Sequence, residues 1–417
     1  MTSDRSQAIY RWGMALLLMA AIAISYLDRQ TLPLALQAVQ ADIPFNNMAK
    51  AALDSAFLMT YGLMYLGGGL LLDRIGTRQG FLLIMAVWSL ACASHGLAGG
   101  LLALAASRLI LGIGEGGGFP AATRAVSEGF APKDRATAMG LINAGTAIGA
   151  VAAWPLIAWV LNHAHWAGLA AWRWVFFLTG GLGLAWVALW ALLYRTPPHA
   201  DTRAEPPIRL RDLLRHRAVW AIVIAKFLSD GAWYFYLFWL PKYLFDSFHI
   251  DLKTAAGFGW IPYAAAGAGA VLGGGLSSLL LRLGLATGSA RKIALGVSAA
   301  LMPWVMLAPQ MHTIAPVILV FSLAFFGQQS WSTLIMVLPT DLIPHRAVGT
   351  LAGLVGFGGA MGGIVLGQVA GALRDQGFSY QPVLIVSGSL HLIGLVLICG
   401  LIPQLRPLDF TKRAQRL

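Results

Sequence analysis

The segment from Ser107 to Ala122 reads SRLILGIGEGGGFPAA, an apolar and glycine-rich run that contains one arginine and one carboxylate. Arg108 and Glu115 are seven residues apart, about two helical turns, so both side chains point to the same side of one helix. A charge at the centre of a membrane helix costs about 2.5 to 3.5 kcal/mol unless it faces a partner or a wet cavity. We therefore expect Arg108 and Glu115 to line a water-filled pathway for an anion and a proton.

The composition of the chain is that of a protein embedded in a bilayer. Hydrophobic residues make up 58% of the 417 residues and charged residues only 11%, with a mean hydropathy of +0.70, a balance that soluble domains of this size do not have. A membrane helix needs about 20 mostly apolar residues, and the chain divides into about twelve such segments. The first of these, from Trp12 onward, is too long for a cleavable signal peptide. The sequence predicts an all-α membrane protein without a separate soluble domain.

Basic residues account for the net charge of +12, and they fall at every second junction between the predicted helices. Lys50 and Lys253 are the clearest exceptions. Under the positive-inside rule this pattern places both termini and the central loop in the cytoplasm. The charge therefore indicates membrane topology and contact with anionic membrane lipids, not nucleic acid. Cys92 and Cys399 lie in separate apolar segments, so neither a disulfide framework nor a metal site is expected.

Six helices are expected in each half of the chain. Those of the first half are predicted at 12–40, 51–72, 80–98, 101–127, 136–160 and 173–194, and those of the second half at 219–245, 255–281, 292–310, 313–340, 346–373 and 380–403. The proline- and arginine-rich residues 196–218 are predicted to form a cytoplasmic central loop with a short surface helix near 210–216. The two six-helix bundles would then span residues 1–195 and 219–417.

The two halves carry a similar junction. The first half has PKDRA at 132–136 and the second has PHRA at 344–347, and each is followed by spaced glycines. A parallel repeat of six plus six spans is a transporter architecture with its substrate site near the bilayer midplane, between the halves. Small residues at steps of four allow close helix packing, and they occur at Gly145 and Gly149 and again at 359, 363, 367 and 371.

The first helix contains YLDRQT at 26–31, which brings charged and polar groups to membrane depth. Adjacent helical residues differ in direction by about 100 degrees, so Asp28 and Arg29 face different neighbours. Because guanidinium groups grip carboxylates bidentately, Arg29 and Arg108 together predict an anionic substrate. The alternative is that each arginine only neutralises Asp28 or Glu115. In both cases these two carboxylates are candidates for proton binding, since burial favours the neutral form of a carboxyl group.

Further polar side chains at membrane depth are candidates for the substrate site: Tyr61, Asn143, Thr146, Lys226, Gln328 and Gln329. Asp230 follows Lys226 by four residues, so an intrahelical ion pair is the alternative role for this lysine. The aromatic run from Trp233 to Trp239 predicts either stacking on a sugar or organic acid, which makes Trp233 a further candidate, or an interfacial belt that faces lipid.

No motif supports enzymatic chemistry. The sequence GIGEGG at 112–117 fits G-x-G-x-x-G, but no predicted strand precedes it, so a dinucleotide site is excluded. A nucleotide P-loop, an HExxH motif and a nucleophile elbow are not found. We therefore predict a protein that is not an enzyme and has no cofactor, with the proton as its coupling ion.

These segments resemble the major facilitator superfamily and, within it, the anion:cation symporters, especially the hexuronate transporter branch. The sequence GLLLDRIGTR at 69–78 is similar to the superfamily's signature between helices two and three. Narrower matches are YLDRQTL at 26–32, RLILGIGEGGGFPA at 108–121, NAGTAIGA at 143–150, KFLSDGAWYFYLFWLPKYL at 226–244 and QQSWS at 328–332.

The resemblance implies a proton-coupled symporter of a carboxylate-bearing organic acid in a bacterial inner membrane, functional as a monomer, whose two bundles rock about a central site. By the same resemblance, Arg29 binds the substrate carboxylate with Tyr26, Tyr61 and Thr146 in the same pocket, and Arg108 pairs with acidic groups or substrate. Asp28 and Glu115 carry protons. The cytoplasmic gate comprises Asp73, Arg74 and Arg78.

Four positions depart from this branch. Gly118 and Leu334 stand where Asn is common, Gln328 where His is common, and Leu279 where the second signature copy usually has Asp. Fewer polar side chains in the pocket weaken the case for a hydroxyl-rich hexuronate and leave room for a less polar carboxylate. A hexuronate or aldonate remains the favoured substrate class. The alternatives are a proton-independent facilitator or exchanger of another organic anion and, more remotely, a transporter-like sensor.

Overall fold

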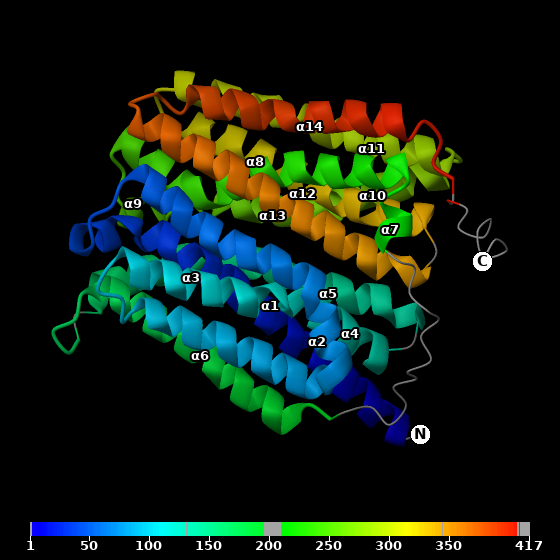
Figure 1. Cartoon of the computed structure of the whole chain (residues 1–417), viewed down its shortest axis with the longest axis horizontal. Coiled ribbons are helices and arrows are strands. Elements are labelled where there is room, and N and C mark those ends of the chain that lie inside the picture. Colours follow the sequence, from blue (N-terminus) through cyan, green and yellow to red (C-terminus); the bar gives the residue numbers. More distant parts are fainter. Residues whose placement is uncertain are drawn as a thin grey trace.

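The computed structural model describes residues 2–130, 132–164, 166–195, 210–343, 345–406 and 408. Over these residues the chain forms helices and no strand, and the helices gather into two bundles that lie against each other (Figure 1). The first half of the sequence forms one bundle and the second half forms the other. The predicted all-α architecture of two bundles is confirmed.

The first bundle comprises α1 (Thr2–Asp42), α2 (Asn47–His95), α3 (Leu101–Gly116), α4 (Gly118–Gly129), α5 (Pro132–His163) and α6 (Ala171–Leu193). The short helix α7 (Leu210–Leu213) lies in the predicted central loop, whose residues 196–209 are outside the described ones. The second bundle comprises α8 (Arg217–Phe248), α9 (Leu252–Ala255), α10 (Ile261–Arg282), α11 (Thr287–Ala300), the 3-10 helix η1 (Met302–Gln310), α12 (Ile314–Leu342), α13 (His345–Asp375) and α14 (Gln381–Leu401).

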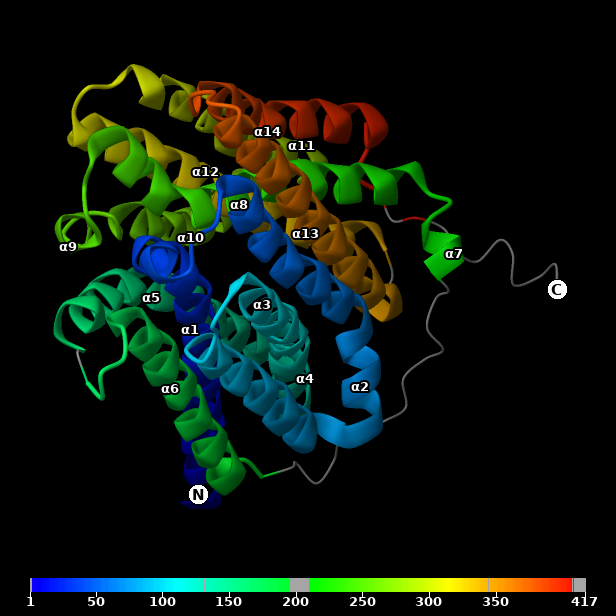
Figure 2. The same cartoon turned by 60° about the vertical axis from the view of Figure 1, so that its left-hand side comes forward.

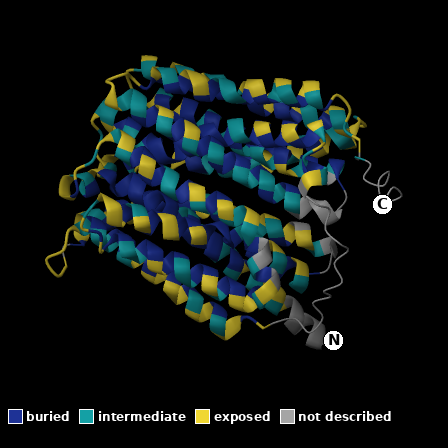
Figure 3. Ribbon diagram, in the orientation of Figure 1, coloured by how far each residue is buried: buried dark blue, intermediate teal, exposed yellow. Residues whose placement is uncertain are grey.

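Eleven helical segments among the described residues are long and apolar enough to cross a membrane. The twelfth expected span, at 51–72, lies in the first arm of α2, where residues 69, 70 and 73 are outside those whose side chains the structure describes. The outer surface of the bundles is rich in apolar side chains, such as Leu102, Leu192 and Val396, which are 86%, 79% and 71% exposed. Figure 3 shows exposed positions mainly on the outside of the bundles and buried positions between the helices.

The second and third predicted helices are joined at a single residue. An unbroken helix of 49 residues would be about 74 Å long, more than twice the roughly 30 Å apolar core of a bilayer. Instead, α2 bends at Gly76, where φ is 78° and ψ is 165°, a backbone region that favours glycine. Figure 2 shows the two arms of α2 on either side of this bend. The predicted seven-residue connection at 73–79 is therefore wrong in length, because the two arms of α2 are joined at the single residue Gly76.

Two other predicted helices are also divided, and a third begins later than predicted. The predicted helix at 101–127 breaks at Gly117, between α3 and α4. The predicted helix at 255–281 begins only at Ile261, as α10, with Pro262 in its first turn. The predicted helix at 292–310 is α-helical only to Ala300, because η1 contains Pro303 and Pro309. Proline lacks the backbone N–H that the α-helical hydrogen-bond pattern needs. Sequence periodicity therefore located these spans but not their breaks.

The small-residue pair on α5 brings α1 close to α5. A Cβ atom on Gly145 would meet the carbonyl oxygen of Met19, and one on Gly149 would meet that of Ala23. Both contacts are with backbone atoms of α1, which cannot move aside as the end of a side chain can. The predicted close packing at this pair is confirmed, and it fixes the position of the helix that contains Arg29.

The predicted glycine ridge of α13 faces two helices. Gly359 lies against Asp230 of α8, Gly363 against Tyr234 of α8 and Leu58 of α2, and Gly371 against Asn47 and Met48 of α2. Gly367 has no neighbouring atom within 4 Å of the place where a Cβ would lie, so the ridge is confirmed at three positions and wrong at the fourth. Helix α13 thus packs between its own bundle and α2 of the other bundle (Figure 2).

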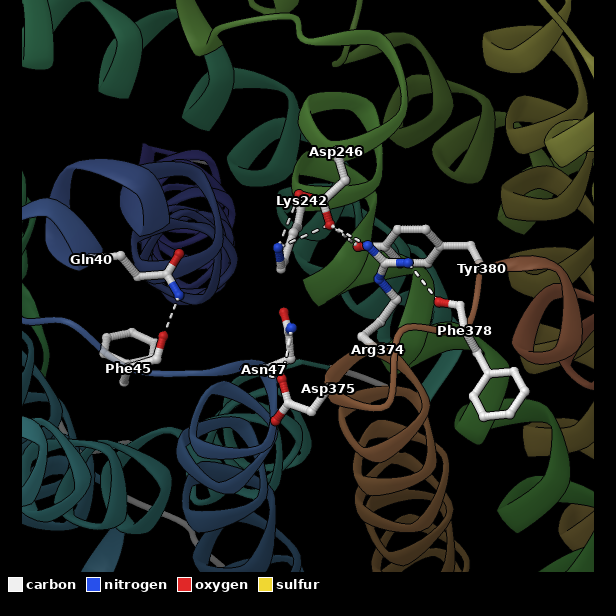
Figure 4. Close-up of polar contacts among 9 residues, drawn as sticks. All are labelled: Gln40, Phe45, Asn47, Lys242, Asp246, Arg374, Asp375, Phe378 and Tyr380. Carbon is white, nitrogen blue, oxygen red and sulfur yellow. Dashed lines mark hydrogen bonds and ion pairs between the residues drawn. The ribbon is translucent and has the colours of Figure 1, made fainter.

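Hydrogen bonds join the two bundles where α2 begins and α13 ends, which we call the Asn47 end. Asp375 Oδ1 accepts from Asn47 N at 3.0 Å and Asn47 Nδ2 at 2.8 Å, and its Oδ2 accepts from Met48 N at 2.8 Å. A carboxylate of the second bundle therefore caps the N-terminus of a helix in the first. Figure 4 shows Asn47 and Asp375 next to each other at this end.

Candidate functional site

A buried ion pair joins α1 to α3 in the first bundle. Arg29 Nε lies 2.6 Å from Glu115 Oε2, and Ser25 Oγ donates to the same oxygen at 2.8 Å. The side chains of Arg29 and Glu115 are 2% and 0% exposed. The other carboxylate oxygen, Glu115 Oε1, has no hydrogen-bond partner among the described residues. Glu115 therefore has one oxygen committed to Arg29 and one free to bind a proton.

Aromatic rings surround the guanidinium of Arg29. Its Cζ lies 4.6 Å from the ring centroid of Tyr26, 4.4 Å from that of Tyr61 and 5.7 Å from that of Phe57. Rings at this range attract a cation through their π-faces. They also hold the planar group in a fixed orientation, so that its remaining N–H donors can meet a carboxylate.

Arg108 is the second buried arginine of this bundle, and it is unpaired. It is 1% exposed, and Nε, Nη1 and Nη2 all lack a hydrogen-bond partner among the described residues. Its nearest aromatic contact is Phe57, with the ring centroid 5.6 Å from Cζ. An uncompensated buried cation is costly. Arg108 and Glu115 lie on the same side of one helix, as predicted, but Glu115 forms its ion pair with Arg29.

Asp28 faces away from Arg29, as the helical geometry predicts. It is fully buried, and its Oδ2 accepts from Trp88 Nε1 on the second arm of α2 at 3.2 Å. Its Oδ1 has no partner among the described residues. A carboxyl group with one neutral donor and no cation beside it is easiest to bury in its protonated form.

A cavity lies between the two bundles, next to this cluster. Its lining includes four predicted site residues: Tyr26 and Thr146 from the first bundle and Trp233 and Gln329 from the second. Tyr263 of α10 also lines it. Tyr26 connects the cavity to the ion pair, because its ring also contacts the guanidinium of Arg29.

Six predicted site residues do not line this cavity: Arg29, Tyr61, Arg108, Asn143, Lys226 and Gln328. Asn143 is exposed on α5, one turn before Thr146, and its backbone oxygen accepts from the Thr146 hydroxyl at 2.8 Å. Gln328 is 1% exposed and turns into the second bundle, where its Nε2 donates to Asp230 Oδ1 at 3.2 Å and its Oε1 contacts His391 Nε2. Adjacent helical residues point about 100 degrees apart, so Gln329 lines the cavity and Gln328 does not.

Lys226 and Asp230 form the predicted intrahelical pair, with 2.9 Å between Lys226 Nζ and Asp230 Oδ1. The aromatic run that follows, Trp233 to Trp239, is buried along its whole length. The interpretation of this run as a lipid-facing belt is therefore wrong. The six aromatic side chains of this run pack between helices because α8 is covered by α12, α13 and α14 and by α1.

The predicted gating residues lie at the bend of α2. Arg78 is exposed, and its Nη2 donates to the backbone oxygen of Ala191 near the end of α6 at 2.8 Å. Arg74 is exposed. The side chain of Asp73 is outside the described residues. Arg78 therefore ties the bend of α2 to α6 within one bundle.

The sequence analysis missed a second buried ion pair of the first bundle. Lys50 Nζ lies 2.6 Å from Asp54 Oδ2, and both residues are buried. The Lys50 ammonium also lies 4.1 Å from the ring centroid of Trp239 in α8, so it joins the two bundles. Lys50 was interpreted as a charge at a junction. The signal for the pair was the spacing of four between Lys50 and Asp54 at the start of an apolar helix.

Two opposed helical bundles, a cavity between them and buried charges at its side define a membrane transporter. The family model described as Major Facilitator Superfamily matches residues 18–367. The chain therefore belongs to the Major Facilitator Superfamily.

Relatives of known name cover nearly the whole chain. The D-galactonate transporter of Escherichia coli O6:H1 is 28% identical over 92% of this chain and 94% of its own length. The hexuronate transporter of Escherichia coli K12 is 28% identical over 93% of both chains. The galacturonate transporter of Dickeya chrysanthemi is 30% identical over 63% of this chain and 80% of its own length. The resemblance to this branch of the superfamily is confirmed.

A solved structure has the same fold. A bacterial homologue of the human lysosomal transporter Spinster, in an inward-facing and occupied conformation, superposes with a TM-score of 0.73. The two sequences are 18% identical, and the match covers 94% of this chain and 96% of the other. The spans, the family and the bacterial relatives together make this chain a multi-pass protein of a bacterial inner membrane.

Proposed function

We propose that the protein is a proton-coupled symporter that imports a carboxylate-bearing organic acid, with sugar acids as the favoured class, by alternating access. The relatives named above are transporters of galactonate, hexuronate and galacturonate, and all of these substrates carry a carboxylate. The observation on which the proposal rests is the Arg29–Glu115 pair beside the cavity, 2.6 Å between Nε and Oε2.

The coupling step follows from competition for Arg29. While Glu115 is ionised, Oε2 holds Arg29 Nε and Ser25 Oγ. A proton that binds the free Oε1 neutralises Glu115 and weakens this charge-assisted pair. The guanidinium can then bind a substrate carboxylate with two parallel N–H donors. Substrate binding in turn favours the protonated form of Glu115, so the proton and the anion bind together.

The two remaining charged residues of this cluster have complementary roles. Arg108, whose three nitrogens have no partner among the described residues, supplies a positive field that attracts the anion towards the cavity. Asp28 is a second proton-binding group, because its Oδ1 also has no partner there. We propose that the protein functions as a monomer. The proposed cycle uses the proton as its coupling ion and needs no other cofactor.

The distribution of basic residues gives the orientation that we propose, with both termini in the cytoplasm. The Asn47 end then faces outwards. Contacts between the bundles occur there, including Asp375 with Asn47 and Gln368 Nε2 with Ser55 Oγ at 2.8 Å. These contacts support a state that is closed on the outside, so that release of substrate would be to the cytoplasm.

The test of the proton role is Glu115→Gln, which keeps the shape of the side chain and removes its titration. We expect substrate exchange to persist and proton-driven accumulation to be lost. Glu128→Gln is the matched control, because Glu128 also pairs with an arginine, Arg124, at 2.8 Å, but away from the cavity. The measurement is the proton-to-substrate ratio in proteoliposomes. An unchanged ratio in Glu115→Gln contradicts the proposed coupling.

A further inference from the structure

The second bundle holds an ion pair that the coupling step above does not use. Lys226 and Asp230 lie one turn apart on α8, and their side chains are 9% and 10% exposed. The corresponding values for Arg29 and Glu115 in the first bundle are 2% and 0%. The pair of the second bundle is thus the more open of the two.

Neighbouring helices hold this pair without using all of its hydrogen-bonding capacity. An ammonium group has three N–H donors. Lys226 Nζ uses one on Asp230 Oδ1 at 2.9 Å and one on Ser332 Oγ of α12 at 2.7 Å. Asp230 Oδ1 also accepts from Gln328, which itself contacts His391 of α14. Contacts among α8, α12 and α14 therefore hold the pair in place. One N–H of Lys226 has no partner among the described residues.

The pair lies on the helix face that continues from the cavity wall, although neither of its residues lines the cavity. Lys226, Asp230 and Trp233 stand at positions i, i+4 and i+7 of α8, which lie on one helix face, and Trp233 lines the cavity. On α12, Gln329 lines the cavity and Ser332, one turn later, accepts from Lys226. The Lys226 ammonium therefore lies on the faces of α8 and α12 that border the cavity.

Tyr26 of α1 connects the cavity to the pair of the first bundle, because it lines the cavity and its ring centroid lies 4.6 Å from Arg29 Cζ. On the side of the second bundle, Lys226 donates to Ser332 of α12, one turn after Gln329, which lines the same cavity. The two ion pairs therefore approach the cavity from opposite bundles.

We propose that Lys226 is a second anion-binding point of the substrate site, and that it makes the protein select organic acids with two anionic ends over the matching monocarboxylates. One carboxylate binds the guanidinium of Arg29, and the other accepts the free N–H of Lys226. This inference rests on the proposed function, since it assigns the substrate class of the same cavity. A sugar diacid such as galactarate carries the two anionic ends that this proposal requires.

A purely structural role explains the pair less well. A buried ion pair contributes little to stability compared with apolar residues of similar size. Helix α8 also has a second Lys–Asp pair with the same spacing, Lys242 and Asp246, with 2.9 Å between Nζ and Oδ2. At that pair, which lies at the Asn47 end, the carboxylate also accepts from Tyr380 at 2.7 Å and contacts Arg374 at 3.5 Å (Figure 4). Lys242 therefore provides a matched control on the same helix.

The experiment compares the binding of galactarate and galactonate to the purified full chain by titration calorimetry. These acids differ at one end, where galactarate has a carboxylate and galactonate has a hydroxymethyl group. One additional charge-assisted hydrogen bond predicts that the wild-type protein binds galactarate about tenfold more tightly. Lys226→Gln should weaken galactarate binding by about the same factor and leave galactonate binding nearly unchanged. Lys226→Arg and Lys242→Gln should both keep the preference for galactarate.

Equal losses for both acids in Lys226→Gln, or no loss for either, overturn the proposal. Thermal unfolding of each variant shows whether it is folded. If Lys226→Gln does not fold, the wild-type comparison decides alone, since galactonate binding as tight as galactarate binding contradicts the proposal. If galactonate binds as tightly as galactarate, the proposed transport of organic acids still stands and only the preference for acids with two carboxylates is contradicted. If the wild-type protein binds neither acid, the proposed function and the proposed preference are both contradicted.

Discussion

Removal of the carboxylate at residue 375 should open the Asn47 end of the protein. In the alternating-access cycle that we propose, Asp375 must leave the N-terminus of α2 each time this end opens. Asp375→Ala deletes all three hydrogen bonds from Asn47 and Met48. Because these bonds cross between the bundles, their loss weakens the closed state without removing any contact of the cavity.

The expected magnitude follows from the cost of losing a helix cap. Replacing a capping acceptor by alanine costs about 0.5 to 2 kcal/mol, typically about 1 kcal/mol. At about 1 kcal/mol, the ratio of closed to open molecules falls about fivefold. Asp251→Ala is the matched control, because Asp251 Oδ1 caps α9 by accepting from Thr254 N at 3.1 Å within one bundle. The Asp251→Ala variant should lose a comparable cap within the second bundle and leave the ratio of closed to open molecules unchanged.

The equilibrium can be measured as the distance between two spin labels. Leu97 follows α2 in the first bundle and is 75% exposed, and Phe378 follows α13 in the second bundle and is 50% exposed. The labels would replace these two residues in a Cys399→Ser background, because Cys399 is exposed while Cys92 is buried. We expect a larger population of long distances in Asp375→Ala than in the wild-type protein or Asp251→Ala. The same distribution in all three proteins would refute the role of Asp375 as a cap between the bundles.

Three further substitutions test other parts of the site and fold. Arg29→Ala should weaken substrate binding by about 2 kcal/mol or more, roughly 30-fold in Kd, because the carboxylate loses its charged partner; unchanged affinity by calorimetry would assign Arg29 a structural role. Arg108→Lys should transport poorly if the planar fork contacts the anion, whereas normal uptake would show that charge alone suffices. Gly149→Ala should destabilise the protein by about 1 to 3 kcal/mol, because its Cβ meets the backbone of Ala23. Gly367→Ala has open space and should unfold no earlier than the wild-type protein. If Gly149→Ala were as stable as Gly367→Ala, the packing account would be contradicted.

The sequence predicted the spans and the identity of the charged residues, because both depend on local chemistry. Apolar runs of about 20 residues and charges inside them are visible without a structure. The direction of Asp28 and Arg29 towards different neighbours was also predictable, since helical geometry alone sets it. The breaks in α2 and α3–α4, at Gly76 and Gly117, were not, because many other glycines of the chain lie inside unbroken helices.

The partners of the charged residues could not be predicted, because they depend on which helices meet. Glu115 pairs with Arg29 of another helix although Arg108 lies two turns away on its own helix. Gln328 and Gln329 are adjacent in sequence, and only the rotation of α12 decides which one lines the cavity. The burial of the run from Trp233 to Trp239 likewise required the position of α8 among its neighbours.

The most direct test of proton-coupled import is uptake into proteoliposomes that contain the purified protein, with and without an inward proton gradient. The substrates are glucuronate, galacturonate, galactonate, galactarate and small mono- and dicarboxylates. We predict that at least one of the sugar acids accumulates above its external concentration only while the gradient is present. Equilibration of the acids regardless of the gradient would contradict coupling through Glu115 and Asp28 and would indicate a facilitator or exchanger of organic anions instead.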